Sequence, residues 1–219
     1  NNKKTKEKSS NYDFFPTEGA CAAILYTFDS LYINGIINNG DKIAVITPIF
    51  TPYIELPSLK RYNMKIIELK GDPNNDYALS DSEINKLKDK SIKGLFIVNP
   101  LNPSAYSLPL DNINKIGKIV NTVRKDLVII SDCVYAPFVN EYNSLMYSCP
   151  KNTIEIFSLS KYFGATGYRL GVIMLRKENI FNQLLKKLPN IKKKELNKRY
   201  ENVSIKPANL TFMERLVLD

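Results

Sequence analysis

Lys161 stands where a lysine could bond covalently to an aldehyde. It follows two serines, Ser158 and Ser160, and Arg169 comes eight residues after it. Apolar runs flank this segment on both sides, so we expect it on a loop between two buried strands. A lysine held on such a loop is a candidate for a Schiff base with an aldehyde cofactor. The arginine and the hydroxyl groups suit a phosphate on the same cofactor.

Two earlier segments could hold the same kind of molecule. Gly19, Ala20 and Cys21 open the first expected long helix, and backbone N–H groups at a helix start can bind phosphate. Many helices begin with small residues for structural reasons alone. Phe50 follows an expected strand and could lie flat on a cofactor ring. The alternative for Phe50 is a core side chain in a proline-rich turn.

Polar side chains follow two later strands. Asn102 lies in an Asn-Pro repeat and could donate to a ring oxygen, although such repeats are also ordinary turn signals. Asp132 follows an apolar run, where an unpaired carboxylate is costly to bury. Paired with a ring N–H it would keep an aromatic cofactor protonated, and the alternative is a helix N-cap. Tyr135 could hydrogen-bond the same ring oxygen.

The composition removes several classes of chemistry. Histidine is absent from the 219 residues, which excludes Ser-His-Asp and Cys-His catalysis and argues against any metal site of the zinc type. Cys21, Cys133 and Cys149 are odd in number and unevenly spaced, as expected for free thiols in a reducing compartment. No apolar run approaches a membrane span, and the first residues do not resemble a signal peptide. We therefore expect a cytoplasmic protein without a membrane partner.

The formal charge of +9 raises the question of nucleic-acid binding. The lysines are dispersed, apart from residues 3–8 and 186–199. The second run follows a helical pattern, which is typical of a solvated helix face. We therefore expect no nucleic-acid partner.

Apolar strand-like segments alternate with amphipathic ones along most of the chain. The predicted strands are 42–47, 65–69, 94–98, 127–131, 153–157 and 171–175. The predicted helices are 20–37, 52–62, 81–89, 110–124, 177–188, 192–200 and 207–218. This alternation predicts an α/β fold with a mostly parallel sheet flanked by helices. The loops at the carboxyl ends of the strands would then bring the residues above together. The spacing between residues 131 and 153 leaves the order of the later strands open.

The order of these segments resembles a known family. Ser-x-Ser-Lys followed by Gly-x-Arg-x-Gly resembles the cofactor-lysine motif of the aspartate-aminotransferase superfamily, the fold-type I pyridoxal-phosphate enzymes, and Asp-x-x-Tyr matches its spacing. The resemblance implies an aspartate-aminotransferase-like large domain, pyridoxal 5'-phosphate as cofactor, no metal, and Lys161 as the catalytic lysine. It implies cofactor contacts from Gly19, Ala20, Cys21, Phe50, Asn102, Asp132, Tyr135, Ser158 and Arg169.

The match departs from the family at two places. The phosphate-binding turn usually reads Gly-Gly-Thr or Ser-Gly-Thr, whereas Ala20 and Cys21 follow Gly19 here. The backbone donors remain, and the threonine hydroxyl is lost. The Asn-Pro-x-Asn-Pro segment continues with Ser104 and Ala105 in place of Thr-Gly.

Between the motifs, the sequence is most similar to the aspartate 4-decarboxylase branch. That resemblance implies β-decarboxylation of L-aspartate to L-alanine and CO₂, with transamination of aspartate as a side reaction. Lys161 would remove the α-proton, and Asp132 would hold the ring protonated. An aminotransferase of other specificity and a non-catalytic remnant that keeps the fold are the alternatives.

The resemblance also predicts a domain organisation. Residues 1–11 are expected to be a disordered polar tail and residues 12–176 the cofactor-binding large domain, truncated. Residues 177–219 would lead toward a small domain that this sequence does not include. A homodimer or a larger homo-oligomer is implied, because sites of this family form between subunits.

Overall fold

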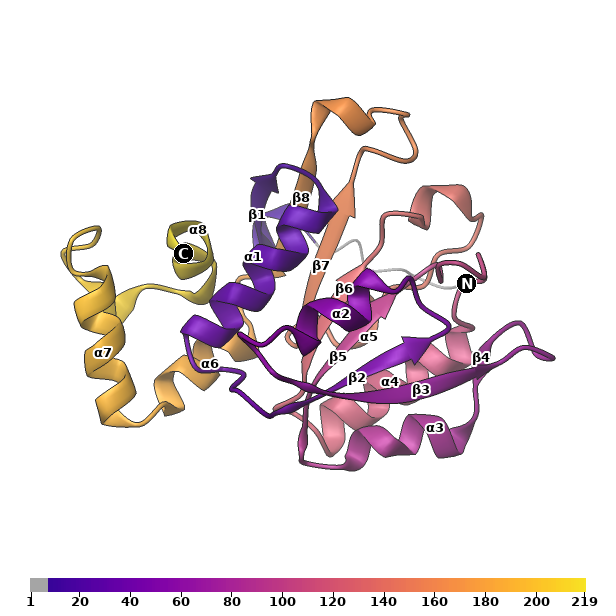
Figure 1. Cartoon of the computed structure of the whole chain (residues 1–219), viewed down its shortest axis with the longest axis horizontal. Helices are drawn as coiled ribbons and strands as arrows, with labels where there is room; N and C mark the ends of the chain where they lie inside the picture. The colour runs from indigo at the N-terminus through magenta and orange to yellow at the C-terminus, as the bar shows by residue number, and fades with distance from the viewer. Residues whose placement is uncertain (1–7) are drawn as a thin grey trace.

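The computed structural model describes residues 8–219 and shows a mixed sheet of eight strands with helices on both faces (Figure 1). The strands are β1 (Tyr12–Thr17), β2 (Lys42–Thr47), β3 (Lys65–Asp72), β4 (Ala78–Leu79), β5 (Ile92–Val98), β6 (Val128–Asp132), β7 (Thr153–Ser158) and β8 (Gly171–Arg176). The α-helices are α1 (Ala20–Ile33), α2 (Pro52–Ser58), α3 (Asp81–Asn85), α4 (Leu110–Thr122), α5 (Leu145–Ser148), α6 (Ile180–Lys187), α7 (Asn190–Tyr200) and α8 (Phe212–Leu218).

The order of the strands across the sheet is β1-β8-β7-β6-β5-β2-β3-β4. Neighbours from β7 through β3 run parallel, with Asp132 of β6 level with Ile156 of β7. Strand β8 runs antiparallel between β7 and β1, and β4 runs antiparallel to β3. The predicted α/β fold with a mostly parallel sheet is therefore confirmed.

All six predicted strands are present, and two further strands were not predicted. The first, β1, pairs with β8 at the edge of the sheet, far away in sequence. The second, β4, has only two residues. Both contain too few residues in a regular apolar pattern to be recognised locally.

Several predicted helices are longer than the real ones. Helix α1 ends at Ile33 rather than residue 37, because Asn34 caps it and Gly35 takes a φ of 69°. The predicted helix 207–218 is a 3-10 turn followed by α8, since Thr211 and Glu214 form a capping box that starts a new helix. In the predicted tail, residues 1–7 lie outside the described residues, and Ser9–Asn11 form one 3-10 turn.

Alternate residues of the strands face two separate cores. Ile43 and Val45 of β2 face the core that α1, α6 and α8 complete. Ala44 and Ile46 face the other core, which α3, α4 and α5 complete. The sheet is thus covered on both sides, which explains why its strands are continuously apolar. Among the helices of residues 8–219, none has the length and apolar character needed to cross a membrane.

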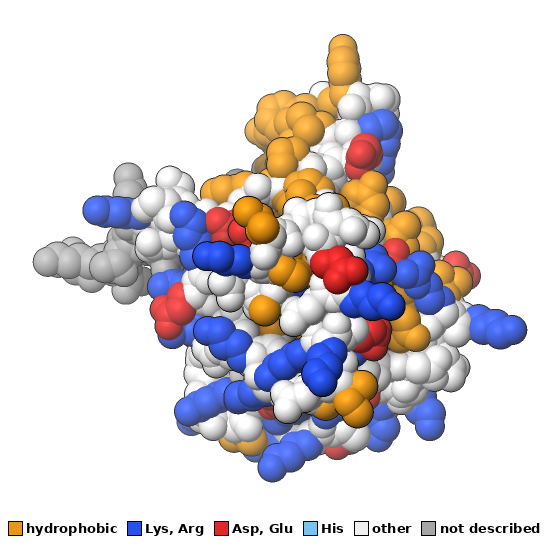
Figure 2. Space-filling model, turned by 90° about the vertical axis from the view of Figure 1, so that its left-hand side faces the viewer, with side chains coloured by type: hydrophobic (Ala, Val, Ile, Leu, Met, Phe, Trp, Pro, Cys, Tyr) orange, Lys and Arg blue, Asp and Glu red, His pale blue; other side chains and the backbone are white. Residues whose placement is uncertain are grey.

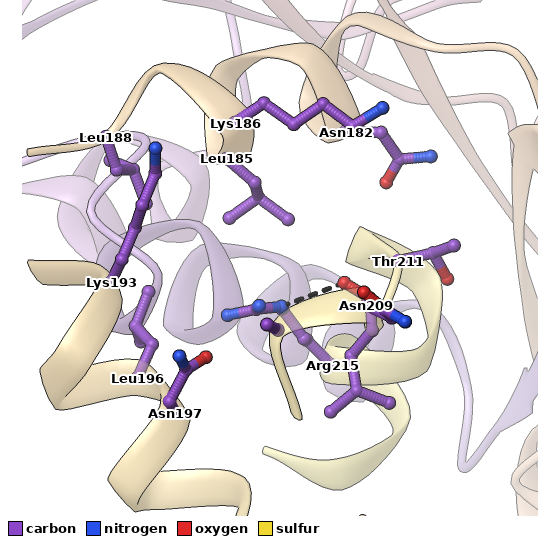
Figure 3. A pocket seen from close by; sticks show the side chains of 12 residues that line it. Asn182, Leu185, Lys186, Leu188, Lys193, Leu196, Asn197, Asn209, Thr211 and Arg215 are labelled. Carbon is purple, nitrogen blue, oxygen red and sulfur yellow. Dashed lines mark hydrogen bonds between the residues drawn. The ribbon is translucent and has the colours of Figure 1, made fainter. Parts of the chain in front are cut away.

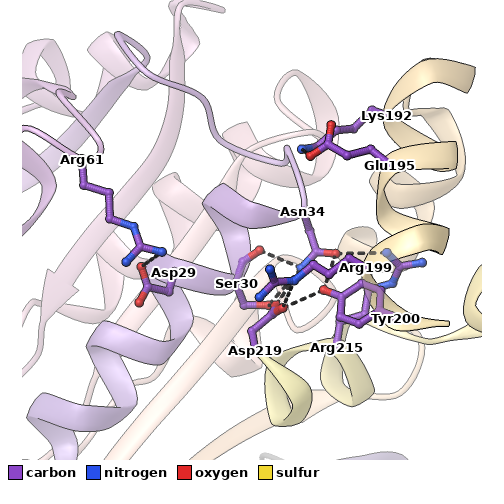
Figure 4. A network of polar contacts seen from close by, with 10 residues as sticks. All are labelled: Asp29, Ser30, Asn34, Arg61, Lys192, Glu195, Arg199, Tyr200, Arg215 and Asp219. Atoms are coloured by element: carbon purple, nitrogen blue, oxygen red, sulfur yellow. Dashed lines mark hydrogen bonds and ion pairs between the residues drawn. The ribbon is translucent and has the colours of Figure 1, made fainter. Parts of the chain in front are cut away.

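A buried polar network joins the end of α1 to α7 and α8 (Figure 4). The Asn34 amide donates to Asp219 Oδ2 at 2.9 Å and accepts from Arg215 Nη1 at 3.1 Å. The Tyr200 hydroxyl donates to Asp219 Oδ1 at 2.7 Å. Asn34 is fully buried, so each of these groups would be costly to leave unpaired. The network ties the C-terminal helices to α1, whose first residues belong to the predicted site.

Candidate active site

The carboxyl ends of four parallel strands bring most of the predicted site residues to one edge of the sheet. Phe50 follows β2, Asn102 follows β5, Asp132 ends β6, and Ser158 and Lys161 lie at the end of β7. The strands β2, β5, β6 and β7 are neighbours in the sheet. An edge of this kind is where α/β sheets bind ligands.

Asp132 lies at the centre of this edge and is completely buried. Its Oδ2 accepts a hydrogen bond from the Tyr53 hydroxyl at 2.7 Å, and its Oδ1 accepts one from the Val134 N–H at 2.9 Å. Burial raises the pKa of Asp132, and the two hydrogen bonds act in the opposite direction. No lysine or arginine among residues 8–219 forms an ion pair with this carboxylate. The site therefore presents a buried acid without a cationic partner.

Tyr53 connects several of the predicted residues. Its ring lies 6.0 Å from that of Phe50, centroid to centroid, in an edge-to-face arrangement. Burial raises the pKa of the Tyr53 hydroxyl, and the charge of Asp132 raises it further, with smaller contributions from Cys21 and Tyr135. Asp132 hydrogen-bonds to this hydroxyl, and Cys21 and Tyr135 act on it electrostatically, so three of the predicted residues influence one group. Phe50 itself is half exposed, so one face of its ring is available.

A second pair, Asn102 and Tyr135, also meets at this edge. The Asn102 amide donates to the Tyr135 hydroxyl over a long 3.4 Å. The sequence predicted both side chains as donors to one oxygen of the cofactor. Their contact places both side chains together, and their role toward a cofactor oxygen stays a prediction.

Arg169 packs against the start of α1. A Cβ built on Gly19 would lie 2.4 Å from Arg169 Nη2, so only glycine allows the guanidinium to come this close. Gly19 also has a φ of 101°, which other residues rarely adopt. The first helical hydrogen bond runs from the Ala23 N–H to the Gly19 carbonyl, so the N–H groups of the residues between them precede the helical ladder. A guanidinium and free N–H groups together suit an anion.

The two serines before Lys161 have different roles in the structure. The buried Ser158 hydroxyl donates to Ser160 Oγ at 3.1 Å and to the Leu170 carbonyl at 3.3 Å. Ser160 Oγ in turn accepts from Arg169 Nη1 at 3.4 Å. Ser158 therefore supports the loop through Ser160, and Ser160 is the one that contacts the arginine.

Lys161 lies on the long β7–β8 loop, which projects from the sheet (Figure 1). It is exposed, and within residues 8–219 its Nζ takes part in no hydrogen bond or ion pair. Apolar side chains gather on the same projecting loop, and Tyr162, Phe163 and Tyr168 are all largely exposed (Figure 2). The Lys161 side chain is thus accessible to a ligand.

These observations fit pyridoxal phosphate. Asp132 lacks a cation that a pyridinium N–H would supply, and the cradle of Gly19 and Arg169 would hold a phosphate. Among residues 8–219, no three His, Cys, Asp or Glu side chains lie close enough together to hold a metal ion.

Comparison with known proteins establishes the family. Residues 12–191 match the model of the family "Aminotransferase class I and II". The chain belongs to this family. It is 44% identical over 207 residues to a bifunctional aspartate aminotransferase and L-aspartate beta-decarboxylase from a Pseudomonas species. That alignment covers 94% of this chain and 39% of the relative, so the chain spans about two fifths of the relative's length.

Solved structures confirm the predicted aspartate-aminotransferase-like fold. A Thermus thermophilus aspartate aminotransferase mutant superposes with a TM-score of 0.65 at 17% identity, covering 94% of this chain and 55% of that one. Cystalysin from Treponema denticola, whose structure contains pyridoxal 5'-phosphate, gives a TM-score of 0.64 at 22% identity, covering 93% and 49%. At these identities the structures support the fold alone.

Two residues of this family member were not predicted as site residues. Tyr53 lies three residues after Phe50, one turn further along the chain in α2, and that spacing was the available signal. Ser160 lay within the quoted lysine motif, but its contact with Arg169 depends on how the loop folds back. Only the structure shows these two contacts.

Proposed function

We propose that the protein is a pyridoxal-phosphate-dependent enzyme that removes the β-carboxylate of L-aspartate as CO₂ and yields L-alanine. Transamination of aspartate would be a side reaction. The observation that carries the proposal is the 44% identity, over 94% of this chain, to a bifunctional enzyme of that description. The buried, cation-free Asp132 next to the lysine loop supports the cofactor independently.

Each site residue has a role in holding the cofactor. Arg169 and the first N–H groups of α1 would bind its phosphate, with Gly19, Ala20 and Cys21 forming the turn and Ser158 supporting the loop. The Phe50 ring would cover one face, and Asn102 and Tyr135 would donate to its ring oxygen. The Asp132 carboxylate would accept the ring N–H. When bound, pyridoxal phosphate supplies the electron sink for bonds broken in the substrate.

Lys161 is the residue that would handle protons. Its Nζ would carry the cofactor in the resting enzyme and, once released by the substrate, would take the proton from the substrate Cα. Asp132, oriented by Tyr53, would hold the proton on the ring nitrogen throughout. This division of roles requires a base that can move, Lys161, and a carboxylate that Tyr53 holds in place, Asp132. The exposed lysine and the fully buried carboxylate match it.

The family supports a second candidate, an aminotransferase with another amino-acid specificity. The family model and the Thermus structure both belong to aminotransferases. In that case Lys161 and Asp132 would keep the same roles, and CO₂ would not be formed. A non-catalytic remnant is the least supported alternative, because the described site retains the acid, the lysine and the anion cradle.

The variant Lys161→Ala tests the proposal in the full-length protein. We expect it to lose both CO₂ release and transamination, together with the absorbance of the lysine-bound cofactor. Lys118→Ala, on the exposed face of α4, is the matched control and should keep all three. Substantial decarboxylation by Lys161→Ala would refute the assignment.

A homo-oligomer is the proposed state of assembly. The exposed aromatic side chains of the β7–β8 loop, among them Tyr168 at 87% exposure, would be covered by a second copy, together with the neighbouring Phe138 at 58%. Light scattering on the full-length protein should give at least twice the mass of one chain. A monomer at micromolar concentration would contradict this part of the proposal.

A further inference from the structure

A cavity of about 510 Å³ lies between α6, α7 and the segment that leads into α8, formed by different residues from the site described above (Figure 3). Leu185, Leu188 and Leu196 form apolar parts of its wall. Ala208 and Leu210 are also apolar, and the other lining residues are polar or charged side chains from α6, α7, α8 and the segment that leads into α8. Its size is within the range of small-molecule sites in proteins.

The charged groups of this cavity all have the same sign. Lys186, Lys193 and Arg215 line it, together with the amides of Asn197 and Asn209. No aspartate or glutamate is among the lining residues in the described part of the chain. A concave surface lined by one sign of charge concentrates its field and attracts the opposite ion.

Two lysines of α6 and α7, Lys186 and Lys193, are set apart from the others on these helices by lining the cavity. Lys192 of α7 pairs with Glu195 at 2.7 Å. Lys186 and Lys193 form no ion pair with any residue in 8–219, and Lys193 is partly buried. Lys187 and Lys194 are exposed and do not line the cavity. The cavity thus has two lysines at its wall, the exposed Lys186 and the partly buried Lys193, and neither has an anionic partner among residues 8–219.

Arg215 supplies a buried cation to the same space, with only 5% of its surface exposed. Its guanidinium donates to the carbonyls of Leu210 at 3.1 Å and Pro207 at 3.2 Å, and to Asn34 Oδ1 at 3.1 Å. These acceptors are all neutral. The nearby Asp219 carboxylate instead accepts from Ser30, Asn34, Arg199 and Tyr200.

The electrostatics of Arg215 agree with this description. Burial lowers the pKa of its guanidinium, while Tyr200 and the charge of the nearby Asp219, which does not hydrogen-bond to it, act in the opposite direction. Three of its five N–H donors form these hydrogen bonds, and all three acceptors are neutral. An anion in the cavity would compensate a buried charge that the protein itself leaves without a bonded counter-ion.

We infer that this cavity is a binding site for a small multivalent anion with carboxylate or phosphate groups. Lys186 and Lys193 would contact the anionic groups, Arg215 would neutralise them from below, and the two asparagine amides would donate hydrogen bonds. The inference does not depend on the proposed decarboxylase activity. The cavity uses other residues and no part of the cofactor site.

Isothermal titration of the full-length holoprotein tests this inference. Citrate serves as the tricarboxylate probe and pyrophosphate as the phosphate probe, each at constant ionic strength set with sodium chloride. We expect at least one of them to bind with a Kd below about 1 mM. The tighter of the two indicates which anionic group the natural ligand carries.

Two double variants locate the binding. Lys186→Gln with Lys193→Gln should weaken it by about tenfold or more, because both direct contacts are lost. Lys187→Gln with Lys194→Gln removes the same charge from the same helices and should change the Kd by less than about twofold. The inference is overturned if neither probe binds, if the first pair binds like the unmodified protein, or if the control pair loses as much affinity as the first.

Discussion

The hydroxyl of Tyr53 donates to Oδ2 of Asp132 at 2.7 Å, although 79 positions separate the two residues in sequence. Together with the Val134 N–H on Oδ1, this bond gives a donor to each oxygen of a fully buried carboxylate. Burial raises the pKa of Asp132, and the Tyr53 bond counteracts it. Tyr53 thus helps to keep Asp132 ionised and fixed in orientation, as a partner for a ring N–H must be.

Tyr53→Phe should weaken the binding of pyridoxal phosphate by about tenfold, because a hydrogen bond to a charged group is lost. Cofactor titration followed by absorbance measures this. Tyr62→Phe is the matched control, since the Tyr62 hydroxyl also donates to an aspartate, Asp29, in another part of the molecule. Both variants should lose some stability. Equal cofactor affinity in the two variants would mean that Tyr53 does not position Asp132.

Gly19→Ala should also weaken cofactor binding by about tenfold or more, because the new Cβ would displace the Arg169 guanidinium. Gly40 is a matched control, since it too has a positive φ, of 83°, but nothing lies within 4 Å of its Cβ position. Both alanines should therefore strain the backbone, by about 1–3 kcal/mol each. Gly40→Ala should leave cofactor affinity unchanged. If it lowers that affinity as much, backbone strain rather than Arg169 is responsible.

Cys21 offers a test of the phosphate turn that does not need activity. Its thiol is exposed, whereas Cys133 and Cys149 are buried, and burial raises the pKa of Cys149 to about 12. A disulfide reagent should modify Cys21 rapidly, in a phase that Cys21→Ser removes. Bound pyridoxal phosphate should slow that phase by about tenfold, because its phosphate would cover the start of α1. An unchanged rate in the holoprotein would place the phosphate elsewhere.

Local pattern sufficed for the central strands. In β2 (Lys42–Thr47) the four central residues are apolar, because the strand is covered on both faces. Its composition alone therefore predicts a buried strand. The edge strand β1 could not be predicted in this way, since it contains Pro16 and is defined by its pairing with β8. Such long-range pairing leaves no mark on a short segment.

The candidate site residues were chosen from residue type, motif spacing and the family resemblance. The cofactor roles of Lys161, Arg169 and Asp132 stay predictions, although the sheet brings their segments to one edge. Tyr53 was not predicted, because its bond to Asp132 depends on how β2 and β6 lie in the sheet, with β5 between them. Sequence order gives the members of the site, and the sheet order gives their contacts.

A second buried carboxyl, Glu155 on β7, predicts how stability depends on pH. It accepts hydrogen bonds from Ser144 and Tyr142, yet burial raises its pKa above the ordinary 4.5. A raised pKa means that the folded state binds the proton more tightly, so this group destabilises the fold as pH rises above about 4.5. Glu155→Gln keeps an acceptor oxygen without the charge. Its stability relative to the unmodified protein should therefore increase from pH 5 to pH 8 in urea unfolding.

Glu178→Gln is the control for this pH dependence. Glu178 is exposed, and its hydrogen bond with Lys151 lowers its pKa, so its contribution has the opposite sign. The stability of Glu178→Gln relative to the unmodified protein should not increase as pH rises. A relative stability of Glu155→Gln that is constant with pH would show that Glu155 is not protonated in the folded state.

The central claim is tested most directly with aspartate labelled at C4, using the full-length gene product with added pyridoxal phosphate. We predict labelled CO₂, with alanine formed in equal amount. Oxaloacetate without labelled CO₂ would contradict the decarboxylase and leave a transaminase. No product at all from a folded protein with bound cofactor would contradict both.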